Sequence, residues 1–137
     1  MASASTRPNV ATVFGILDII FGVLGISSIQ YWNSMNAFLG EFYNILLAAG
    51  SLLSILLLAA GILLLMNRAM ALQLNLYYAW ISIGLAVLRS LYVIVKGGIP
   101  GFMIGVFSVG ISLIYPILIL AILLKNREVG AFYSSKK

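Results

Sequence analysis

The sequence predicts an all-α integral membrane protein, a bundle of four transmembrane helices in up-and-down antiparallel order. Composition points there first, since 63% of the 137 residues are hydrophobic and only 8% are charged, against about 25% in an ordinary soluble domain. Four apolar stretches can each cross a hydrocarbon core of about 30 Å, at residues 10–30, 45–66, 71–95 and 102–124. Small residues recur along each stretch at spacings of three and four, on one helix face. We expect one transmembrane domain, residues 1–137.

The residue types that the chain lacks exclude several kinds of chemistry. It contains no cysteine and no histidine, and its only carboxylate side chains are Asp18, Glu41 and Glu128. Disulfides, thiol chemistry, ordinary zinc sites, histidine-ligated haem and histidine-dependent catalytic triads are therefore excluded. We expect no catalytic, cofactor-binding or metal-binding residues. The net charge of +5 lies mostly at the chain ends and short loops, which favours membrane orientation over nucleic-acid binding.

The first apolar stretch, 10–30, is predicted to be a retained helix. Arg7 and Pro8 precede it, and a basic residue before an apolar run can open a secretory signal. The run is longer than the apolar core of such a signal, however, and no small-residue cleavage site follows it. Pro8 suits the first turn of a helix, where a missing N–H costs little. The single charge within the helix is Asp18.

The connecting segments differ in character. Residues 31–44 place aromatic and polar residues on opposite sides at helical spacing, which predicts a short amphipathic interfacial helix; a plain loop with interfacial aromatic residues is the alternative. Asn67–Ala69 is a turn short enough only for an antiparallel return, and Lys96–Gly101 is a turn by its glycines and proline. The basic tail, 125–137, is expected either to lie on an anionic membrane surface or to be disordered.

The basic residues predict how the protein is oriented. Lysine and arginine are concentrated on the cytoplasmic side of membrane proteins. In the predicted topology Lys96 lies on one side together with Glu41, and six basic residues lie on the other. Both termini of this multi-pass protein should therefore be cytoplasmic. The six residues are Arg7, Arg68, Lys125, Arg127, Lys136 and Lys137.

The small residues are predicted to form seams along which the helices pack. Lipid tails give no hydrophobic reason to bury leucine, so van der Waals contact between small faces should supply most of the association energy. A period of 3.5 residues predicts left-handed crossings near +20°. The alternative is that small residues are simply common in membrane helices. Pro116 is expected to bend the last helix by removing a backbone hydrogen bond. The seams comprise Gly15, Gly22, Gly25, Gly50, Ser54, Gly61, Gly105 and Ser108.

A second set of side chains forms a predicted intramembrane polar site. At about 1.5 Å per residue, Asp18 and Tyr115 lie at the same depth, about 12 Å from the cytoplasmic ends of their helices, and Tyr78 lies close to it. A buried carboxyl without a basic partner would be neutral and tie helices together; the alternative is a proton site that titrates during transport. The candidate residues are Asp18, Asn75, Tyr78, Ser82, Ser112 and Tyr115.

Arg89 is predicted not to pair with Asp18. It lies about 25 Å from the cytoplasmic end of its helix, too far from the depth of Asp18 for the two side chains to meet. Its guanidinium should extend toward the outer interface, where Glu41 is the expected partner in an ion pair.

The segment RPNVATVFGILDIIFG, Arg7–Gly22, resembles the start of small four-span bacterial membrane proteins with an RPxxVTVFGILxIIFG-like beginning. The resemblance covers the first helix only, implies a bacterial source and an inner-membrane location, and carries over no functional residue. Small multidrug exporters are similar in having four short spans with one acidic residue in the first. Here Asp18 stands where that family has glutamate, the loops are longer, and no third-helix motif matches.

Three functions are compatible with these features. The leading hypothesis is a non-enzymatic accessory, scaffold or assembly subunit whose partners are the lipid bilayer and other membrane subunits or further copies of itself. The alternative is a small proton- or cation-coupled transporter or channel that works as a homo-oligomer through Asp18. A lipid-handling role for the aromatic segment 31–43 is a weaker third hypothesis.

Overall fold

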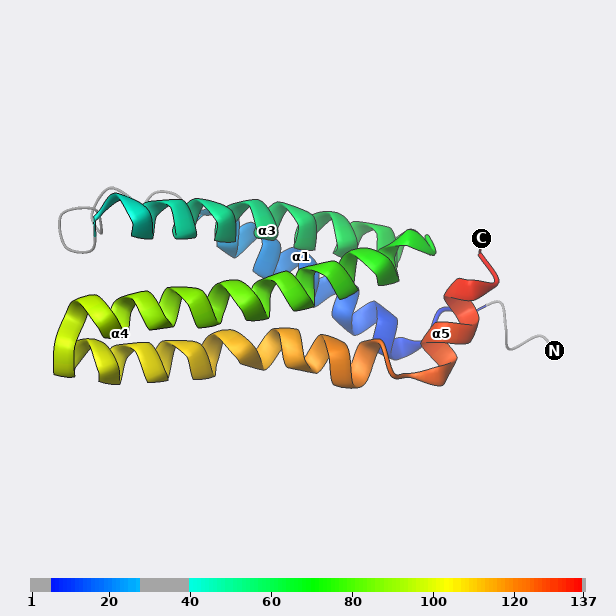
Figure 1. Ribbon diagram of the computed structural model, residues 1–137. Helices are drawn as coiled ribbons and strands as arrows, with labels where there is room; N and C mark the ends of the chain where they lie inside the picture. The colour runs from blue at the N-terminus through cyan, green and yellow to red at the C-terminus, as the bar shows by residue number, and fades with distance from the viewer. Residues whose placement is uncertain (1–5, 28–39, 137) are drawn as a thin grey trace.

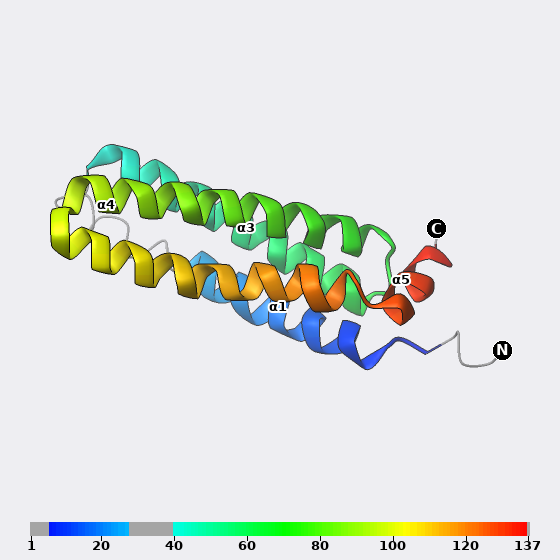
Figure 2. The same cartoon turned by 60° about the horizontal axis from the view of Figure 1, so that its bottom comes forward.

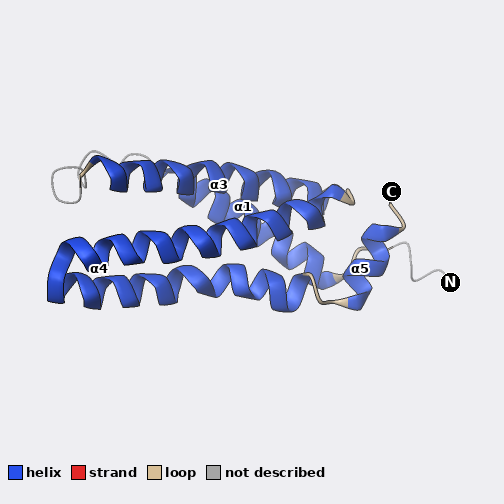
Figure 3. Ribbon diagram, viewed as in Figure 1, coloured by secondary structure: helices blue, strands red, loops and turns tan. Residues whose placement is uncertain are grey.

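The computed structural model describes residues 6–27 and 40–136, and every regular element in these ranges is helical (Figures 1 and 3). The all-α prediction is confirmed for these residues. Most of the predicted interfacial segment, 31–44, lies outside the described residues. The elements are α1 (Asn9–Ser27), α3 (Glu41–Leu65), α4 (Met70–Leu118), the π-helix η3 (Ile119–Leu123) and α5 (Arg127–Ser134).

Three of the described helical segments are long and apolar enough to cross a membrane. They are α1, α3, and the continuous run of α4 and η3 from Met70 to Leu123. Mid-helix residues such as Leu52 and Ile55 are largely exposed, which suits helices whose outer surface meets lipid. The coarse prediction of apolar helices long enough to span a membrane is therefore confirmed.

Helix α4 is a hairpin within one helical element. Its chain reverses at the end far from the termini, and its two halves then lie side by side (Figures 1 and 2). The reversal is concentrated at Gly98, whose φ of 59° and ψ of −143° are accessible essentially to glycine alone. Pro100 falls in the first turn of the returning half, where its missing N–H has no helical partner to lose. The predicted turn over 96–101 is thus much tighter than expected.

The start of α3 also differs from the prediction. The helix begins at Glu41 rather than Ile45, so the last residues assigned to the interfacial segment belong to its first turn. Gly40 precedes it with a φ of 82°, a left-handed conformation that favours glycine. This glycine fixes where the helix starts.

The apolar core lies toward the end of the bundle where the described chain begins and ends. Phe14, Leu64, Ile119 and Leu123 are buried there together with Tyr133 of α5. Close to this end, Pro116 is followed by the π-helix η3, in which the Leu124 N–H donates to the Ile119 carbonyl at 3.0 Å. The feature observed after Pro116 is thus a wider helical turn, and the predicted bend at Pro116 stays a prediction.

The C-terminal segment folds onto this end as α5. The Asn126 side chain caps the helix by accepting hydrogen bonds from the backbone N–H groups of Glu128 (2.9 Å) and Val129 (3.1 Å). The apolar side of α5, which includes Val129, Phe132 and Tyr133, is buried. The alternative of a disordered tail is wrong for these residues, because burial of three apolar side chains at helical spacing outweighs the surrounding charge.

Candidate intramembrane polar site

The polar site rests on the close approach of α1 and α3. A Cβ atom added at Gly61 would lie 2.7 Å from the Asp18 Cβ, and one added at Gly22 would lie 2.8 Å from the Leu58 Cβ. Real Cβ atoms essentially never come so close, so only glycine permits this separation of the two backbones. The Asp18 side chain thus lies directly against α3, because the two backbones approach closely at Leu58, Gly61 and the glycines of α1.

Six of the eight predicted seam positions lie at such contacts. Gly15 faces Leu65, and Gly25 faces Ser54, which is itself a seam position. Gly22 and Gly61 lie at the contacts with Leu58 and Asp18. Gly105 packs inside the α4 hairpin, where an added Cβ would lie 2.7 Å from the Ile94 side chain. The other two positions do not need a small residue for packing: Gly50 has only Leu85 within reach, at 3.8 Å, and Ser108 lines a surface groove.

Asp18 is fully buried and is bonded to the returning half of α4. The Tyr115 hydroxyl donates a hydrogen bond to Asp18 Oδ1. The Tyr115 ring is held by two aromatic side chains of α1, with centroid distances of 6.2 Å to Phe14 and 4.6 Å to Phe21. The contact predicted between Asp18 and Tyr115 is therefore present, and it ties α1 to the last long helical run.

Asn75 completes the cluster from the first half of α4. Its side chain is fully buried beside Asp18, and its amide Nδ2 donates to the Ala71 carbonyl at 3.1 Å. Asp18 Oδ2 and Asn75 Oδ1 are both buried without a hydrogen-bond partner within the part of the chain that the structure describes. A protonated Asp18 carboxyl offers a donor at this place, whereas a carboxylate offers only acceptors.

A second polar group lies nearer the Gly98 turn. Arg89 Nη2 donates to Ser112 Oγ at 3.1 Å, which joins the two halves of α4. Both residues line a cavity of about 210 Å³ together with Tyr78 and Ser82. The six predicted polar-site residues are therefore divided. Asp18, Asn75 and Tyr115 form one cluster, and Ser82 and Ser112 line the cavity. Tyr78 also lines the cavity and lies close enough to Asp18 and Tyr115 to interact with both.

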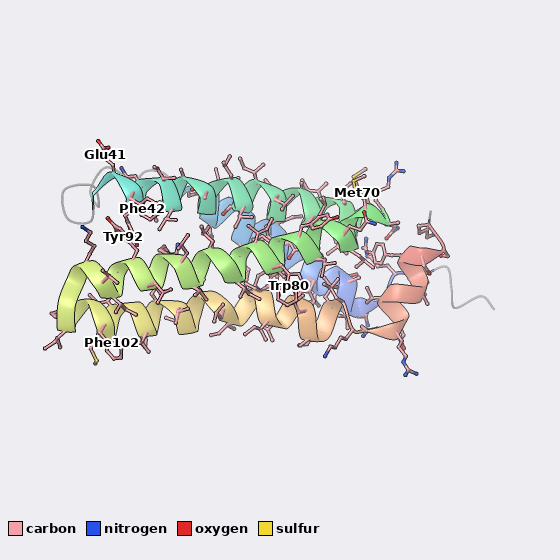
Figure 4. The ribbon with its side chains drawn as sticks, in the orientation of Figure 1. Glu41, Phe42, Met70, Trp80, Tyr92 and Phe102 are labelled. Atoms are coloured by element: carbon pink, nitrogen blue, oxygen red, sulfur yellow. The ribbon has the colours of Figure 1, made fainter. Side chains whose placement is uncertain are left out.

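The predicted ion pair between Glu41 and Arg89 is not formed. Glu41 points away from the bundle at the start of α3, whereas Phe42 points inward to Tyr92 with a centroid distance of 5.1 Å (Figure 4). Within residues 6–27 and 40–136, the hydrogen-bond partner of Arg89 is a hydroxyl and not a carboxylate. The prediction used depth alone and ignored the direction of Glu41 around the helix axis. Arg89 does avoid Asp18, as predicted. Its guanidinium does not extend toward the outer interface, however, because it bonds to Ser112, which lies farther from the Gly98 turn than Arg89 does.

The C-terminal end of α3 carries contacts that sequence reasoning missed. The Tyr133 hydroxyl donates to the Leu64 carbonyl at 2.6 Å, and the Arg7 guanidinium donates to the Leu65 carbonyl. Both carbonyls belong to the last turn of α3, where helical partners are lacking and a positive charge is favourable. The Asn-x-Glu start of α5 and its apolar spacing could have indicated the helix, but not its docking position.

The described residues contain no group of three or more Asp or Glu side chains that could hold a metal ion. The chemistry available to these residues is hydrogen bonding, proton exchange at Asp18 and the binding of an anion by the Arg89 guanidinium. No protein-family model, curated protein or solved structure matches this chain.

Proposed function

We propose that this protein is a non-enzymatic, multi-pass membrane protein that acts as an accessory or assembly subunit of a membrane complex. The observation that carries the proposal is a notched apolar face on the returning half of α4, centred on Gly110. In this proposal each half of α4 crosses the membrane, which gives four spans.

The proposed topology places both termini in the cytoplasm. The excess of basic residues at the end of the bundle where the described chain begins and ends supports it. The resemblance of the Arg7–Gly22 segment to small bacterial membrane proteins is the reason for proposing the inner membrane. Because the chain has no cysteine, single cysteines can be introduced and labelled with a membrane-impermeant maleimide in intact cells. A cysteine replacing Gly97 should be labelled from outside, and one replacing Ser135 should be labelled only after the membrane is opened. The reverse pattern would refute the topology.

The notched face has the shape of a helix-docking surface. An added Cβ at Gly110 would meet nothing within 4 Å, and the shallow groove around it has a volume of about 410 Å³. The groove is flanked by Phe107, which is 74% exposed, and by Ile111 and Ile114. Phe102 projects outward farther along the same helix (Figure 4). A glycine between large apolar side chains lets a partner helix approach closely, which is how membrane helices associate.

The docking proposal is tested with a matched pair of glycine substitutions. Gly84 of the first half of α4 also has nothing within 4 Å of an added Cβ, so leucine fits the monomer at either position. Wild-type protein, Gly110→Leu and Gly84→Leu are purified from the native membrane in mild detergent, and the complexes are sized and identified. We expect Gly110→Leu to lose a stoichiometric membrane partner that Gly84→Leu retains. Isolation of the wild type as a monomer, or equal retention by both variants, would contradict the assembly function.

A second candidate function is favoured by the unpartnered oxygens at Asp18. Buried acceptors without donors are sites where a proton or a cation can bind, and an ionisable residue within a membrane span is often functional. The test is proton-dependent flux in liposomes containing the wild type or Asp18→Asn. Flux that is present in the wild type and absent in a folded Asp18→Asn would replace the assembly function with transport.

A further inference from the structure

The cavity beside Arg89 is a polar hollow between three helical rods. Arg89, Tyr78 and Ser82 reach it from the first half of α4, Ser112 from the returning half, and Leu53 from α3. Its volume of about 210 Å³ lies below that of sites for drug-sized ligands. The cavity therefore suits a small polar group attached to, or bordered by, apolar material.

The positive charge in this cavity has no anionic partner in the described protein. Arg89 is half-buried, and its hydrogen bond to Ser112 Oγ uses one of the five N–H donors of the guanidinium. Arginine cannot lose its charge in proteins, and a charge held at membrane depth is costly unless an anion or water compensates it. Glu41, which could have supplied that anion, points away from the bundle.

The donors around the cavity match the chemistry of a phosphate. The guanidinium fork binds two phosphate oxygens at once, and the Ser112 hydroxyl can donate to a further oxygen. Tyr78 and Ser82 are hydrogen-bonded to each other, which leaves one more hydroxyl donor between them. A carboxylate has two oxygens and would leave some of these donors unused. Gly50 forms part of the wall and leaves the space in which the group would sit.

The cavity lies inside the membrane-spanning part of the bundle. The first half of α4 is about 42 Å long, so each end extends about 6 Å beyond a hydrocarbon core of about 30 Å. Arg89 lies about 13 Å before Gly98, which places its Cα about 7 Å below the core boundary, and its hydrogen-bond partner Ser112 lies about 15 Å below the same boundary. The guanidinium is therefore held where lipid tails cannot solvate its charge, and the nearer leaflet is the one at the Gly98 end.

We propose that this cavity is a phosphate-binding site, with Arg89 as the charged ligand and Ser112, Ser82 and Tyr78 as hydroxyl donors. The phosphate is supplied either by a phospholipid headgroup of the leaflet at the Gly98 end or by a soluble phosphate compound. This site is separate from the Gly110 face and does not depend on the assembly function.

The experiment measures binding to the full chain in mild detergent. Phosphatidylglycerol is added and retained lipid is counted by native mass spectrometry; in a second arm, inorganic phosphate is titrated and thermal unfolding is followed. One retained phosphatidylglycerol per chain identifies a headgroup site, and a saturable rise in melting temperature with phosphate identifies a soluble ligand. Binding in neither arm would overturn the proposal.

Three variants separate a built site from general charge attraction. Arg89→Gln removes the charged donor, and Gly50→Leu fills the cavity while leaving Arg89 in place; an added Cβ at Gly50 has its nearest neighbour at 3.8 Å, so the fold tolerates it. Arg127→Gln makes the same charge change on the exposed surface of α5. We expect the first two to weaken binding by about 10- to 100-fold and the third to leave it unchanged. Equal effects of Arg89→Gln and Arg127→Gln, or full binding by a folded Gly50→Leu, would overturn the site.

Discussion

The Tyr133 hydroxyl donates a 2.6 Å hydrogen bond to the carbonyl oxygen of Leu64, a residue 69 positions earlier in the chain. This contact fixes α5 against the last turn of α3, next to the point where Arg7 binds the Leu65 carbonyl. Three segments that are remote in sequence are thus held at one helix end. The stability of this end can be tested separately from the polar site inside the bundle.

Tyr133→Phe should destabilise the protein by about 0.5 to 1.5 kcal/mol, because it removes a hydrogen bond and leaves the Leu64 carbonyl without that donor. Thermal unfolding in detergent measures the loss. Tyr77→Phe is the matched control, since Tyr77 is 58% exposed. Equal melting temperatures for wild type and Tyr133→Phe would show that the contact contributes nothing.

The same tyrosine predicts a loss of stability at high pH. Burial raises the pKa of Tyr133 above its ordinary value of 10.0, with a smaller opposing effect of the Arg7 charge. The neutral phenol is therefore favoured in the folded state. Its contribution is fully present below about pH 10 and is lost as the pH rises through the folded-state value. Melting temperatures of wild type and Tyr133→Phe are measured from about pH 8 to about pH 12, a range that brackets the ordinary tyrosine pKa of about 10. The two melting temperatures should converge as the pH rises. A constant difference would contradict the titration.

Gly22→Leu should disrupt the packing of α1 on α3. An added Cβ already meets the Leu58 backbone nitrogen at 2.9 Å, so the two helices must separate. Overpacking of this kind typically costs about 1 to 3 kcal/mol, and separation of two backbones belongs at the upper end. Val23→Leu is the control, because Val23 is 49% exposed on the outer side of α1. Normal thermal stability of Gly22→Leu would show that the seam is not an interface.

Asp18→Asn should fold with near-normal stability, whereas Asp18→Ala should lose about 1 to 3 kcal/mol. Asparagine keeps one acceptor for the Tyr115 hydroxyl and adds a donor group in place of Oδ2, as a protonated aspartic acid would. Alanine leaves the buried hydroxyl and amide oxygens without partners. Thermal unfolding of the two variants makes the comparison. A stability of Asp18→Asn as low as that of Asp18→Ala would indicate that the charged carboxylate is required.

The sequence was most informative where a local pattern determines structure. Apolar runs located the long helices, and small-residue spacing located the close contacts at Gly22 and Gly61, because helical periodicity alone decides which residues share a face. Depth counting likewise placed Asp18 opposite Tyr115. These inferences need only helix geometry and the thickness of a bilayer.

The sequence was least informative where two properties of different segments had to be combined. Glu41 and Arg89 are at compatible depths, but the outward direction of Glu41 depends on how α3 is rotated in the bundle. The docking of Tyr133 on Leu64 depends on the relative position of two helix ends, which no local pattern records. The cavity beside Arg89 similarly arises from residues of three helical rods.

Gly98 has a consequence for the depth at which the two halves of α4 lie. It is the one position with non-helical backbone angles inside α4, so a residue that favours helical angles there would favour a straight rod of about 74 Å, far longer than a bilayer is thick. In such a rod the returning half could no longer bring Tyr115 back to Asp18, and the buried carboxyl would lose its hydrogen-bond donor. A single glycine thus keeps both halves of the hairpin side by side at one level.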